Sequence, residues 1–511
     1  MKSLYITFIS LLAISATYAQ EPADALRYSF LTQNGTARNQ AIGGAGVSLG
    51  GEFSSLFINP AGLGLYKTNE FVFTPSYSLK NDKSTYIGNN AASKYDNFNL
   101  GASGLLFSSS SEGRPVKNIT FAIGVNKIAD FNNHVYYKGR NTNSSYSEKY
   151  LEELVNNNVT DPNSAANDYP YGSSLAFNTY LIDTVQAADG SVSGYRSAAN
   201  PSFGLSQENT INTSGGITDI SLGAGINLKE KWFFGGSIAF PFLNYNRDAT
   251  FRESDLSGDV NNNFNYFESN ETLQTKGVGV NARLGVIYKP AEDIRLGLAI
   301  HTPTFYNLTD RYTTEIVTDL EGYGGAGVKH QSSTDLSSDG APLESKYNLV
   351  TPLRLMASGS YIFHEVADVT HQKGFITADI EYVDYKASSF SAVDNTDATA
   401  GDYYSSLNET IDNLYKNAFN FRVGGEVKFN TIMARLGGAY YSNPYKNQKA
   451  DLVKLSGGLG YRNKGIFIDL TYVYSLNKDV HYPYILQDKP NTPATIKNNG
   501  GNIIATIGFK I

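Results

Sequence analysis

From residue 70 to the end of the chain, apolar and polar residues alternate with a period of two. Residues 220–228 place aliphatic side chains at every second position, with Ser, Gly or Asn between them, and residues 278–286 and 466–472 follow the same rule. Successive side chains of a strand point to opposite faces, so this pattern predicts strands with one apolar and one polar face. A soluble sandwich also alternates, so strand lengths and connections must distinguish the two folds.

The alternation predicts fourteen strands, many of them close to the ~9–11 residues that a tilted strand needs to cross a bilayer. They lie near 70–79, 96–107, 118–128, 215–228, 232–245, 275–288, 293–306, 350–362, 374–386, 418–429, 431–442, 452–462, 465–475 and 501–511. Short turns alternate with long polar connections. The short turns are 228–232, 288–294, 429–431 and 462–465, and the long connections are 129–214, 246–274, 307–349, 387–417 and 476–500, after a modest one at 80–95.

Both chain ends fall on the short-turn side of this arrangement. Short periplasmic turns opposite long extracellular loops are typical of outer-membrane barrels. The predicted fold class is therefore all-β, a 14-stranded antiparallel transmembrane β-barrel, with long extracellular loops at 129–214 and 307–349 above all.

The start of the chain has the features of a signal peptide, which predicts export. Lys2 gives a basic start, Leu4 to Ile14 is apolar, and small residues up to Ala19 precede Gln20. The apolar run is shorter than the about 20 residues of a membrane-spanning helix. A retained anchor is the alternative, but no stop-transfer flank follows.

A stretch rich in glycine and small residues, Gly35 to Leu65, precedes the first strand. Together with a short helix predicted near 23–28, it predicts an N-terminal plug, or hatch, over residues 20–68 inside a barrel of residues 69–511. Closely spaced glycines allow tight packing in a confined lumen. Nucleotide binding is disfavoured because no strand precedes the glycines and no Lys-Ser/Thr follows them. The candidate gate residues are Gly43, Gly44, Gly46, Asn59, Pro60, Ala61 and Gly62.

Asn59-Pro60 also has a simpler interpretation as an ordinary turn, since Pro fixes φ and Asn caps its own backbone. Its position between the glycine-rich stretch and the first strand favours the plug.

Composition and charge exclude several classes of function. The chain has no cysteine, and its six histidines match no zinc-ligand spacing. The formal net charge of −7 comes without a basic patch, which argues against nucleic acid as a partner. Many Tyr, Phe and Gly residues beside a single Trp fit a barrel whose polar lumen dilutes its apolar exterior. The sequence predicts no cofactor, no metal site and no catalytic constellation, hence no enzyme.

Two further segments support this picture. Residues 503–511 form a terminal amphipathic strand similar to those read by barrel-assembly machinery, although Ile511 closes it instead of an aromatic residue. Within 129–214, residues 146–156 show helical spacing, which predicts a short helix that either caps the barrel mouth or packs the loop. Tyr and Phe near strand ends suit interfacial girdles, with ordinary β-propensity as the alternative.

These features together resemble the FadL/TodX-type outer-membrane transporters of long-chain fatty acids and aromatic hydrocarbons, in the branch common in Bacteroidetes-like bacteria. The resemblance covers the signal peptide, the hatch, fourteen strands and the terminal strand. Its sharpest element is the hatch motif of the family, Asn-Pro-Ala, which falls on Asn59, Pro60 and Ala61 after Gly43-Gly44-Ala45-Gly46. The resemblance implies passive transport, with sideways exit of the ligand through an opening in the barrel wall.

Ionisable residues fall on the face opposite the aliphatic one, which places them in the lumen. A charge on the lipid face would cost ~2–4 kcal/mol at mid-depth. Two roles are open: pairing with one another and with the plug, which the near balance of acids and bases favours, or binding a substrate carboxylate. The candidates are Arg283, Arg295, Arg354, Asp379, Glu381, Arg422, Glu426, Arg435 and Asp469, with Lys428 on the same face.

The expected function is passive uptake of small hydrophobic compounds, of the long-chain fatty acid or aromatic hydrocarbon class, through a plugged monomeric barrel in the bacterial outer membrane. Its expected partners are a hydrophobic ligand, outer-membrane lipid and, during biogenesis, the assembly machinery. The alternative is an accessory barrel that binds a partner in a secretion or adhesion complex through its extracellular loops.

Overall fold

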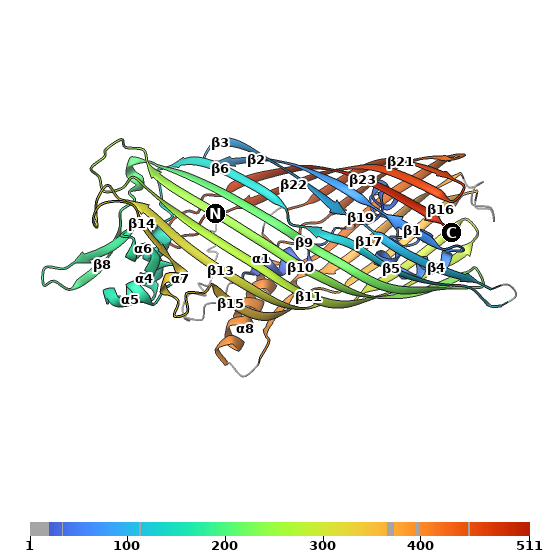
Figure 1. The fold of residues 1–511 in the computed structure, drawn as a ribbon, viewed down its shortest axis with the longest axis horizontal. Coiled ribbons are helices and arrows are strands. Elements are labelled where there is room, and N and C mark those ends of the chain that lie inside the picture. The colour runs from blue at the N-terminus through green and yellow to red at the C-terminus, as the bar shows by residue number, and fades with distance from the viewer. Residues whose placement is uncertain (1–19, 33, 112–113, 365–372, 395–397, 448–449) are drawn as a thin grey trace, which may run out of the picture.

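One antiparallel sheet closes on itself as a 14-stranded barrel, so the predicted fold class is confirmed (Figure 1). The computed structural model describes residues 20–511 apart from 33, 112–113, 365–372, 395–397 and 448–449, and the predicted signal peptide lies outside the described residues. Closure is made by β23 (Ala494–Lys510), which pairs with β1 (Glu70–Phe73) and β2 (Pro75–Tyr86).

The chain passes along the wall fourteen times, and each passage is called here a crossing. Some crossings are broken into two strands, and the others are one continuous strand. The broken ones are β1 with β2, β3 (Asn89–Leu100) with β4 (Ser103–Ser110), β5 (Val116–Asp130) with β6 (Asn133–Asn141), β12 (Ile294–His301) with β13 (Phe305–Asp319), β15 (Leu343–Val350) with β16 (Arg354–Phe363), and β17 (Gly374–Asp384) with β18 (Ser389–Ala392). The continuous ones are β9 (Leu205–Leu228), β10 (Trp232–Asp255), β11 (Tyr266–Ala291), β19 (Asn417–Phe429), β20 (Ile432–Tyr441), β21 (Leu452–Asn463), β22 (Ile466–His481) and β23.

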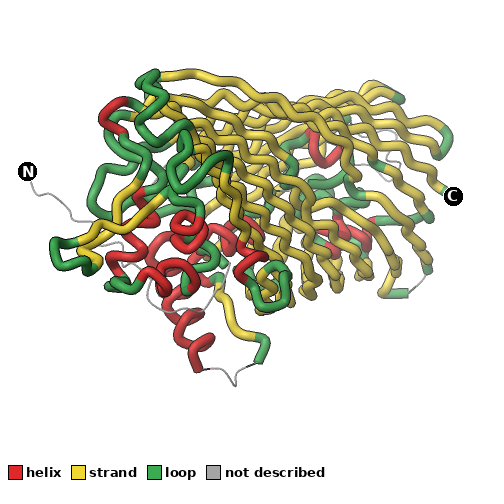
Figure 2. Tube along the Cα trace, turned by 60° about the vertical axis from the view of Figure 1, so that its left-hand side comes forward, coloured by secondary structure: helices red, strands yellow, loops and turns green. Residues whose placement is uncertain are grey.

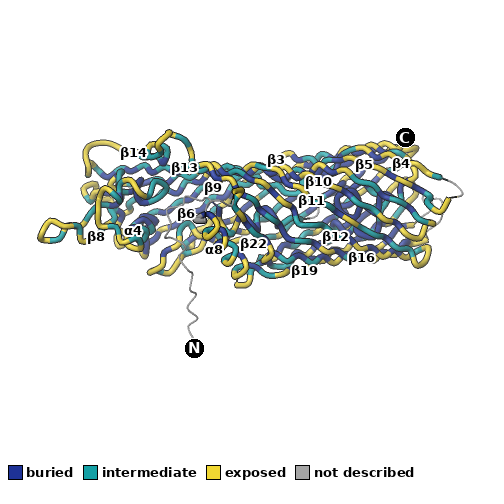
Figure 3. The backbone as a smooth tube through the Cα atoms, turned by 90° about the horizontal axis from the view of Figure 1, so that it is seen from below, coloured by how far each residue is buried: buried dark blue, intermediate teal, exposed yellow. Residues whose placement is uncertain are grey.

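An apolar band surrounds the outside of the barrel. On β10 the outward residues are apolar from Trp232 to Phe242 and polar from Asn244 onward. Ten residue steps of about 3.3 Å, tilted by about 45°, span about 23 Å, which matches the apolar band of a membrane barrel. Trp232 stacks on Tyr288 at the short-turn edge of this band, with ring centroids 4.2 Å apart. Buried and exposed positions alternate along the strands (Figure 3).

The wall is tall on one side and low on the other. Strands β9, β10 and β11 have 24, 24 and 26 residues, whereas β19 and β20 have 13 and 10. The tall side therefore continues far beyond the apolar band at the end that carries the long connections, called here the loop end; the opposite end is the turn end.

This height corrects the predicted loop boundaries. Most of 246–274 and 307–349 is strand, and β6 and the first half of β9 take up part of 129–214. Above the band the alternation changes sense, because polar side chains face outward and apolar ones such as Phe251 and Phe267 face inward. Strand segments above the band have polar side chains on their outward face. A prediction that looks for apolar outward positions therefore assigns such segments to loops.

Two neighbouring crossings are interrupted at prolines, and two threonines form hydrogen bonds between the crossings at that point. Pro303 lies between β12 and β13, and Pro352 between β15 and β16. The backbone N–H of Thr304 donates to Oγ1 of Thr351 at 2.9 Å, and the N–H of Thr351 donates to the carbonyl of Thr304 at 3.0 Å. The backbone groups that a proline break frees are thus satisfied within the wall.

Helices gather at the loop end. The predicted helix at 146–156 is α4 (Glu148–Asn156), which packs with α5 (Pro162–Asn167), α6 (Ser173–Asn178) and the hairpin of β7 (Ile182–Gln186) and β8 (Val192–Ser197) (Figure 1). A second, unpredicted helix, α8 (Ala398–Leu414), follows β18 on the low side of the wall (Figures 1 and 2). Shorter elements are β14 (Lys329–Ser332), α7 (Ser333–Leu336), η2 (Pro201–Phe203) and η3 (Tyr385–Ala387).

The N-terminal segment lies within the barrel. Its elements are α1 (Pro22–Ser29), α2 (Ala37–Ala41), α3 (Ser55–Ile58) and η1 (Pro60–Leu65). Wall side chains donate to its backbone: Ser237 to the carbonyl of Leu56 at 3.1 Å, and Thr471 to that of Ala37 at 2.7 Å. Helical turns are visible inside the strand cylinder in Figure 2.

The position of the band generates a prediction for two substitutions on the same face of β10. Ile238→Arg places a charge at mid-band and is expected to reduce the free energy of folding into lipid vesicles by about 2–4 kcal/mol. Thr250→Arg lies above the band, beside Arg252, and is expected to change it by about 0–1 kcal/mol. Urea titrations of the refolded variants measure both changes in folding free energy. Equal losses of folding free energy in the two variants would contradict the position of the apolar band.

Candidate functional site

Asn59 joins the N-terminal segment to the wall. Its side-chain oxygen accepts from the N–H of Ala61 at 3.1 Å, which caps η1, with Pro60 in the first turn. Its Nδ2 lies 2.7 Å from the carbonyl oxygen of Val47 and 3.3 Å from that of Leu298 on β12. The side chain therefore starts the turn, as an ordinary Asn-Pro would, and also bonds to the wall.

Wall glycines let the segment approach backbone to backbone. A methyl group on Gly235 of β10 would lie 2.2 Å from the carbonyl oxygen of Pro60, and one on Gly285 of β11 would lie 1.7 Å from Oδ1 of Asn59. Real Cβ contacts do not come below 3.0 Å. The wall at these positions admits glycine alone unless the segment moves.

The glycines of the segment have matching roles. Gly43 and Gly44 have φ of +71° and +78°, a region that disfavours other residues. A methyl on Gly43 would meet the backbone of Gly438 at 2.5 Å, and its N–H donates to Oγ of Ser456 at 3.1 Å. Gly46 packs on Asn39, and Gly62 on Gly50 and Ser55. The candidate gate residues are thus the docking surfaces of the segment.

A buried charge network ties the segment to the low side of the wall. Arg38 of α2 pairs with Glu426 of β19 at 3.1 Å. Arg435 lies between Glu426 and Asp469, 2.5 and 2.6 Å from them, and all three wall side chains are buried. In this low-dielectric setting each charge needs its partner.

The remaining lumenal charges also have partners in the protein. Glu381 pairs with Arg422 and, at 3.2 Å, with Arg354. Arg283 pairs with Asp219 and bonds to Ser221. Arg295 donates to the carbonyl of Leu49, and Asp379 accepts from the N–H of Val47 at 3.2 Å. The structure therefore places the predicted set in the lumen, bonded within the wall and to the N-terminal segment.

Residues 20–32 and 34, called here the arm, run through the lumen above the glycine-rich part of the segment. Gln20 is buried: its Nε2 donates to Asp310 of β13 at 2.9 Å, and Tyr403 of α8 donates to its carbonyl at 2.7 Å. Lower down, Arg354 donates to the carbonyls of Ser29 and Leu31 at 2.6 and 3.1 Å. The arm is held by the tall wall, by α8 and by one lumenal arginine.

Helix α1 of the arm occupies an aromatic pocket at the loop end. Tyr28 lies against Phe131 and Tyr245, with ring centroids 6.0 and 6.1 Å apart, and Arg27 lies 4.6 Å over the Tyr245 ring. The pocket is lined by aliphatic and aromatic side chains from wall strands, from η3 and from α8 and the residue that follows it. These include Ile217, Leu243, Leu273, Tyr306, Leu308, Tyr347, Leu349, Tyr385, Phe390, Tyr404, Leu407, Ile411 and Tyr415.

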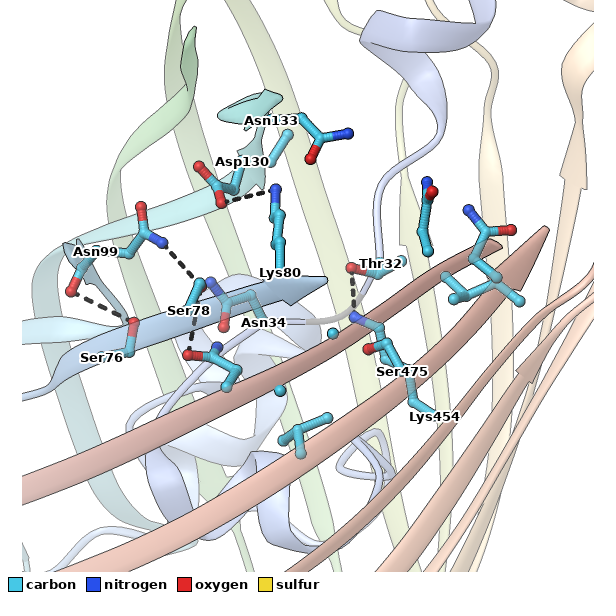
Figure 4. Close-up of a pocket in the computed structure, with 18 of the residues that line it drawn as sticks. Thr32, Asn34, Ser76, Ser78, Lys80, Asn99, Asp130, Asn133, Lys454 and Ser475 are labelled. Atoms are coloured by element: carbon cyan, nitrogen blue, oxygen red, sulfur yellow. Dashed lines mark hydrogen bonds and ion pairs between the residues drawn. The ribbon is translucent and has the colours of Figure 1, made fainter. Parts of the chain in front are cut away.

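A polar cavity of about 400 Å³ lies beside the arm (Figure 4). Thr32 and Asn34 of the arm and Gln40 of α2 form part of its lining, and strands from both sides of the barrel closure form most of the rest. Lys80 and Lys127 pair with Asp130 at 3.2 and 2.9 Å, and Lys454 donates to Oγ1 of Thr32 at 2.9 Å. The sequence analysis missed this cavity because its residues come from seven separate strands, from α2 and from the arm.

The wall ladder is interrupted next to this cavity. Strand β4 pairs with β5 up to Ser103 and Val125, but β6 pairs only with β9, so β3 and β6 lie side by side without a described backbone ladder. Side chains bridge them instead: Oγ of Ser93 donates to the carbonyl of His134 at 2.6 Å, and Asn97 donates to Asp130 at 3.3 Å. The interruption begins at the edge of the apolar band, where outward Phe98 is followed upward by Asp96 and Lys94.

Solved structures of similar architecture exist. A FadL homologue of Pseudomonas aeruginosa superposes with a TM-score of 0.55 at 13% identity, over 94% of this chain and 99% of that one. The toluene transporter TbuX of Ralstonia pickettii gives 0.50 at 14% identity, over 94% and 100%. The toluene transporter TodX of Pseudomonas putida gives 0.50 at 13% identity, over 94% and 99%.

The fold is that of the FadL- and TodX-type barrels. At these identities the likeness concerns architecture, in agreement with the resemblance seen in the sequence. No protein-family profile matches the chain, and no curated protein matches it. Within the part of the chain that the structure describes, no helix is both long and apolar enough to cross a membrane.

The close contact between wall glycines and the N-terminal segment predicts different effects for alanine at two neighbouring positions of this FadL-like barrel. Gly235→Ala drives a methyl into Pro60 and is expected to displace the N-terminal segment, with raised ion conductance in planar bilayers and faster protease cleavage of residues 35–66. Gly236→Ala points outward, where the nearest atom is Leu284 Cδ2 at 3.3 Å, and serves as the control. Equal conductance of the two variants would contradict the docking role.

The charge network predicts a large effect at Glu426. Glu426→Gln leaves Arg38 without its carboxylate and Arg435 with one partner instead of two, so the free energy of unfolding is expected to fall by about 3–5 kcal/mol. Glu409→Gln removes an exposed carboxylate on α8 and is expected to change it by less than about 0.5 kcal/mol. Urea unfolding in lipid vesicles gives both values, and a cost at Glu426 as small as that of the control would rule out a stabilising network.

Proposed function

We propose that this chain is a bacterial outer-membrane channel for passive uptake of small hydrophobic compounds, with residues 20–68 as its plug. The apolar band, the closed wall and the unequal ends support placement in the outer membrane, with the turn end periplasmic and the loop end extracellular. The fold shared with the FadL homologue and the toluene transporters supports the substrate class.

The aromatic pocket filled by α1 is the observation that carries the proposal. A hydrophobic compound gains little in a water-filled pore, whereas an apolar pocket near the mouth offers it a dry site. Here Ala25, Leu26 and Tyr28 already fill such a site. A ligand that takes their place displaces the arm, and displacement of the arm frees the neighbouring cavity.

The route then leads sideways. The cavity borders the interruption between β3 and β6, where side-chain bonds replace the ladder and part more readily than a strand pair. We place the lateral opening there. Movement down a concentration gradient through this opening needs only displacement of the arm, which makes the transport passive.

The lumenal charges hold the plug in this proposal. Arg38, Arg295 and Asp379 connect segment and wall, and the other predicted charges pair within the wall. Their protein partners favour this role over binding of a substrate carboxylate. The proposal also includes a monomeric barrel in contact with outer-membrane lipid, inserted by assembly machinery that reads β23.

Deleting residues 20–32 tests the proposal because it removes α1 but leaves the glycine-docked part of the plug. Uptake of toluene and of a fluorescent fatty acid into proteoliposomes is expected to rise several-fold over the intact protein, while ion conductance in planar bilayers stays low. Deleting residues 20–66 is expected to give an ion-conducting pore.

Two outcomes would overturn the proposal. One is steady ion conduction by the intact protein as an open pore. The other is hydrophobic uptake equal to that of empty liposomes in both intact and shortened proteins. A stable partner captured through residues 142–204, in the absence of uptake, would instead favour the accessory-barrel alternative.

A further inference from the structure

The cavity beside the arm has a chemical character unlike that of the aromatic pocket. Most of its lining residues have charged, amide or hydroxyl side chains, although Ile128, Ala129, Phe131, Leu452 and Val473 also line it. A plain hydrocarbon finds few contacts in such a site, since polar groups lose hydration when apolar atoms cover them.

One cation in this lining lacks a carboxylate. Lys80 and Lys127 share Asp130 on one side of the cavity, and the pair of Lys80 with Asp130 is drawn in Figure 4. Lys454 lies apart from them and bonds to the hydroxyl of Thr32; among the described residues no carboxylate lies within ion-pair distance of its Nζ. A half-buried ammonium that faces an open cavity is a site for an anionic group.

The same lining contains two hydrogen-bond acceptors to which no group of the described residues donates. The side-chain oxygens Oδ1 of Asn133 and Oδ1 of Asn498 are both covered and have no hydrogen-bond partner among the described residues. Asn133 lies on β6 at the interrupted wall, and Asn498 on β23 across from it. Neither oxygen is accessible in this arrangement, but rotation of the side-chain amide turns it toward the cavity that both residues line, where an N–H or O–H group of a ligand satisfies it.

The apolar end of the cavity fixes the direction of a bound molecule. Phe131 lines the cavity and also packs edge-on against Tyr245 of the aromatic pocket, with ring centroids 5.4 Å apart. A molecule with its head group in the cavity therefore directs its hydrocarbon part past Phe131 into the space that α1 fills. The cavity of about 400 Å³ has room for on the order of ten waters, far more than a bare carboxylate occupies.

We propose that the transported compound is an amphiphile with a large polar head group, in which one anionic group binds Lys454 and amide N–H or hydroxyl donors bind Asn133 and Asn498, as in an N-acylated amino acid. The proposal rests on the channel function above and narrows its substrate class. The head group leaves through the gap between β3 and β6, at the level where the outer face of the wall turns polar. A polar head crosses no apolar layer on that route.

Binding to the full-length protein in nanodiscs tests the head group with three probes of equal tail length. N-dodecanoylglycine carries an anion and an amide N–H, dodecanoate carries the anion alone, and dodecane carries neither. By titration calorimetry, N-dodecanoylglycine is expected to bind about tenfold or more tightly than dodecanoate.

Substitutions in the cavity test which residue contacts which part of the head group. Lys454→Met is expected to weaken N-dodecanoylglycine about tenfold or more and to leave dodecane unchanged, while Lys454→Arg retains binding. Asn498→Leu is expected to erase the preference for N-dodecanoylglycine over dodecanoate. Lys497→Met, on the exposed face of β23 next to Asn498, is the matched control, and heat-modifiable migration in gels shows that each variant is folded.

The two levels of the proposal fail in different ways. If toluene and dodecanoate enter proteoliposomes while N-dodecanoylglycine binds no more tightly than dodecanoate, the head-group inference is wrong and the channel stands. If Lys454→Met and Lys497→Met bind N-dodecanoylglycine equally, the assignment of the anion to Lys454 is wrong. If no probe enters proteoliposomes with either the intact or the arm-deleted protein, the channel function fails and the inference with it.

Discussion

The constraint on which this structure depends is that backbone groups inside a bilayer find no water. Every N–H and carbonyl in the apolar band must bond within the protein, so the sheet has to close, and β23 meets β1 and β2. The proline breaks obey the same rule, since Thr304 and Thr351 bond to each other across the gap. The unpaired stretch between β3 and β6 begins only where the outward face becomes polar.

The same constraint explains which parts of the fold the sequence reveals. Outward positions from Trp232 to Phe242 must be apolar because lipid covers them, so the band appears as strict alternation and all fourteen crossings are predictable. Above the band water satisfies the outer face, and strand positions such as Asn244 and Asp248 have the composition of loops. The helix α8 was missed for a related reason, since its acidic outer face resembles its polar surroundings.

The candidate site shows a similar division. Arg422, Glu426 and Asp469 are predictable as lumenal because a charge cannot face lipid at those positions, but their partners are not. Arg38 and Asp219 come from other parts of the chain, and only the closed fold brings them near. The cavity is harder to predict from the sequence, because Lys80, Lys127 and Lys454 lie on strands that come together only when the barrel closes.

The unequal height of the wall has a consequence for how a compound would reach the proposed channel. From Asn244 to Asp255 the tall side rises about 25 Å above the band, while the low side ends near it and carries α8. The rim of the barrel is therefore stepped, high at β9, β10 and β11 and low at β19 and β20. In the proposed channel, molecules that are already adsorbed on the bilayer and diffuse in two dimensions meet the low side first, so their surface concentration governs the encounter rate.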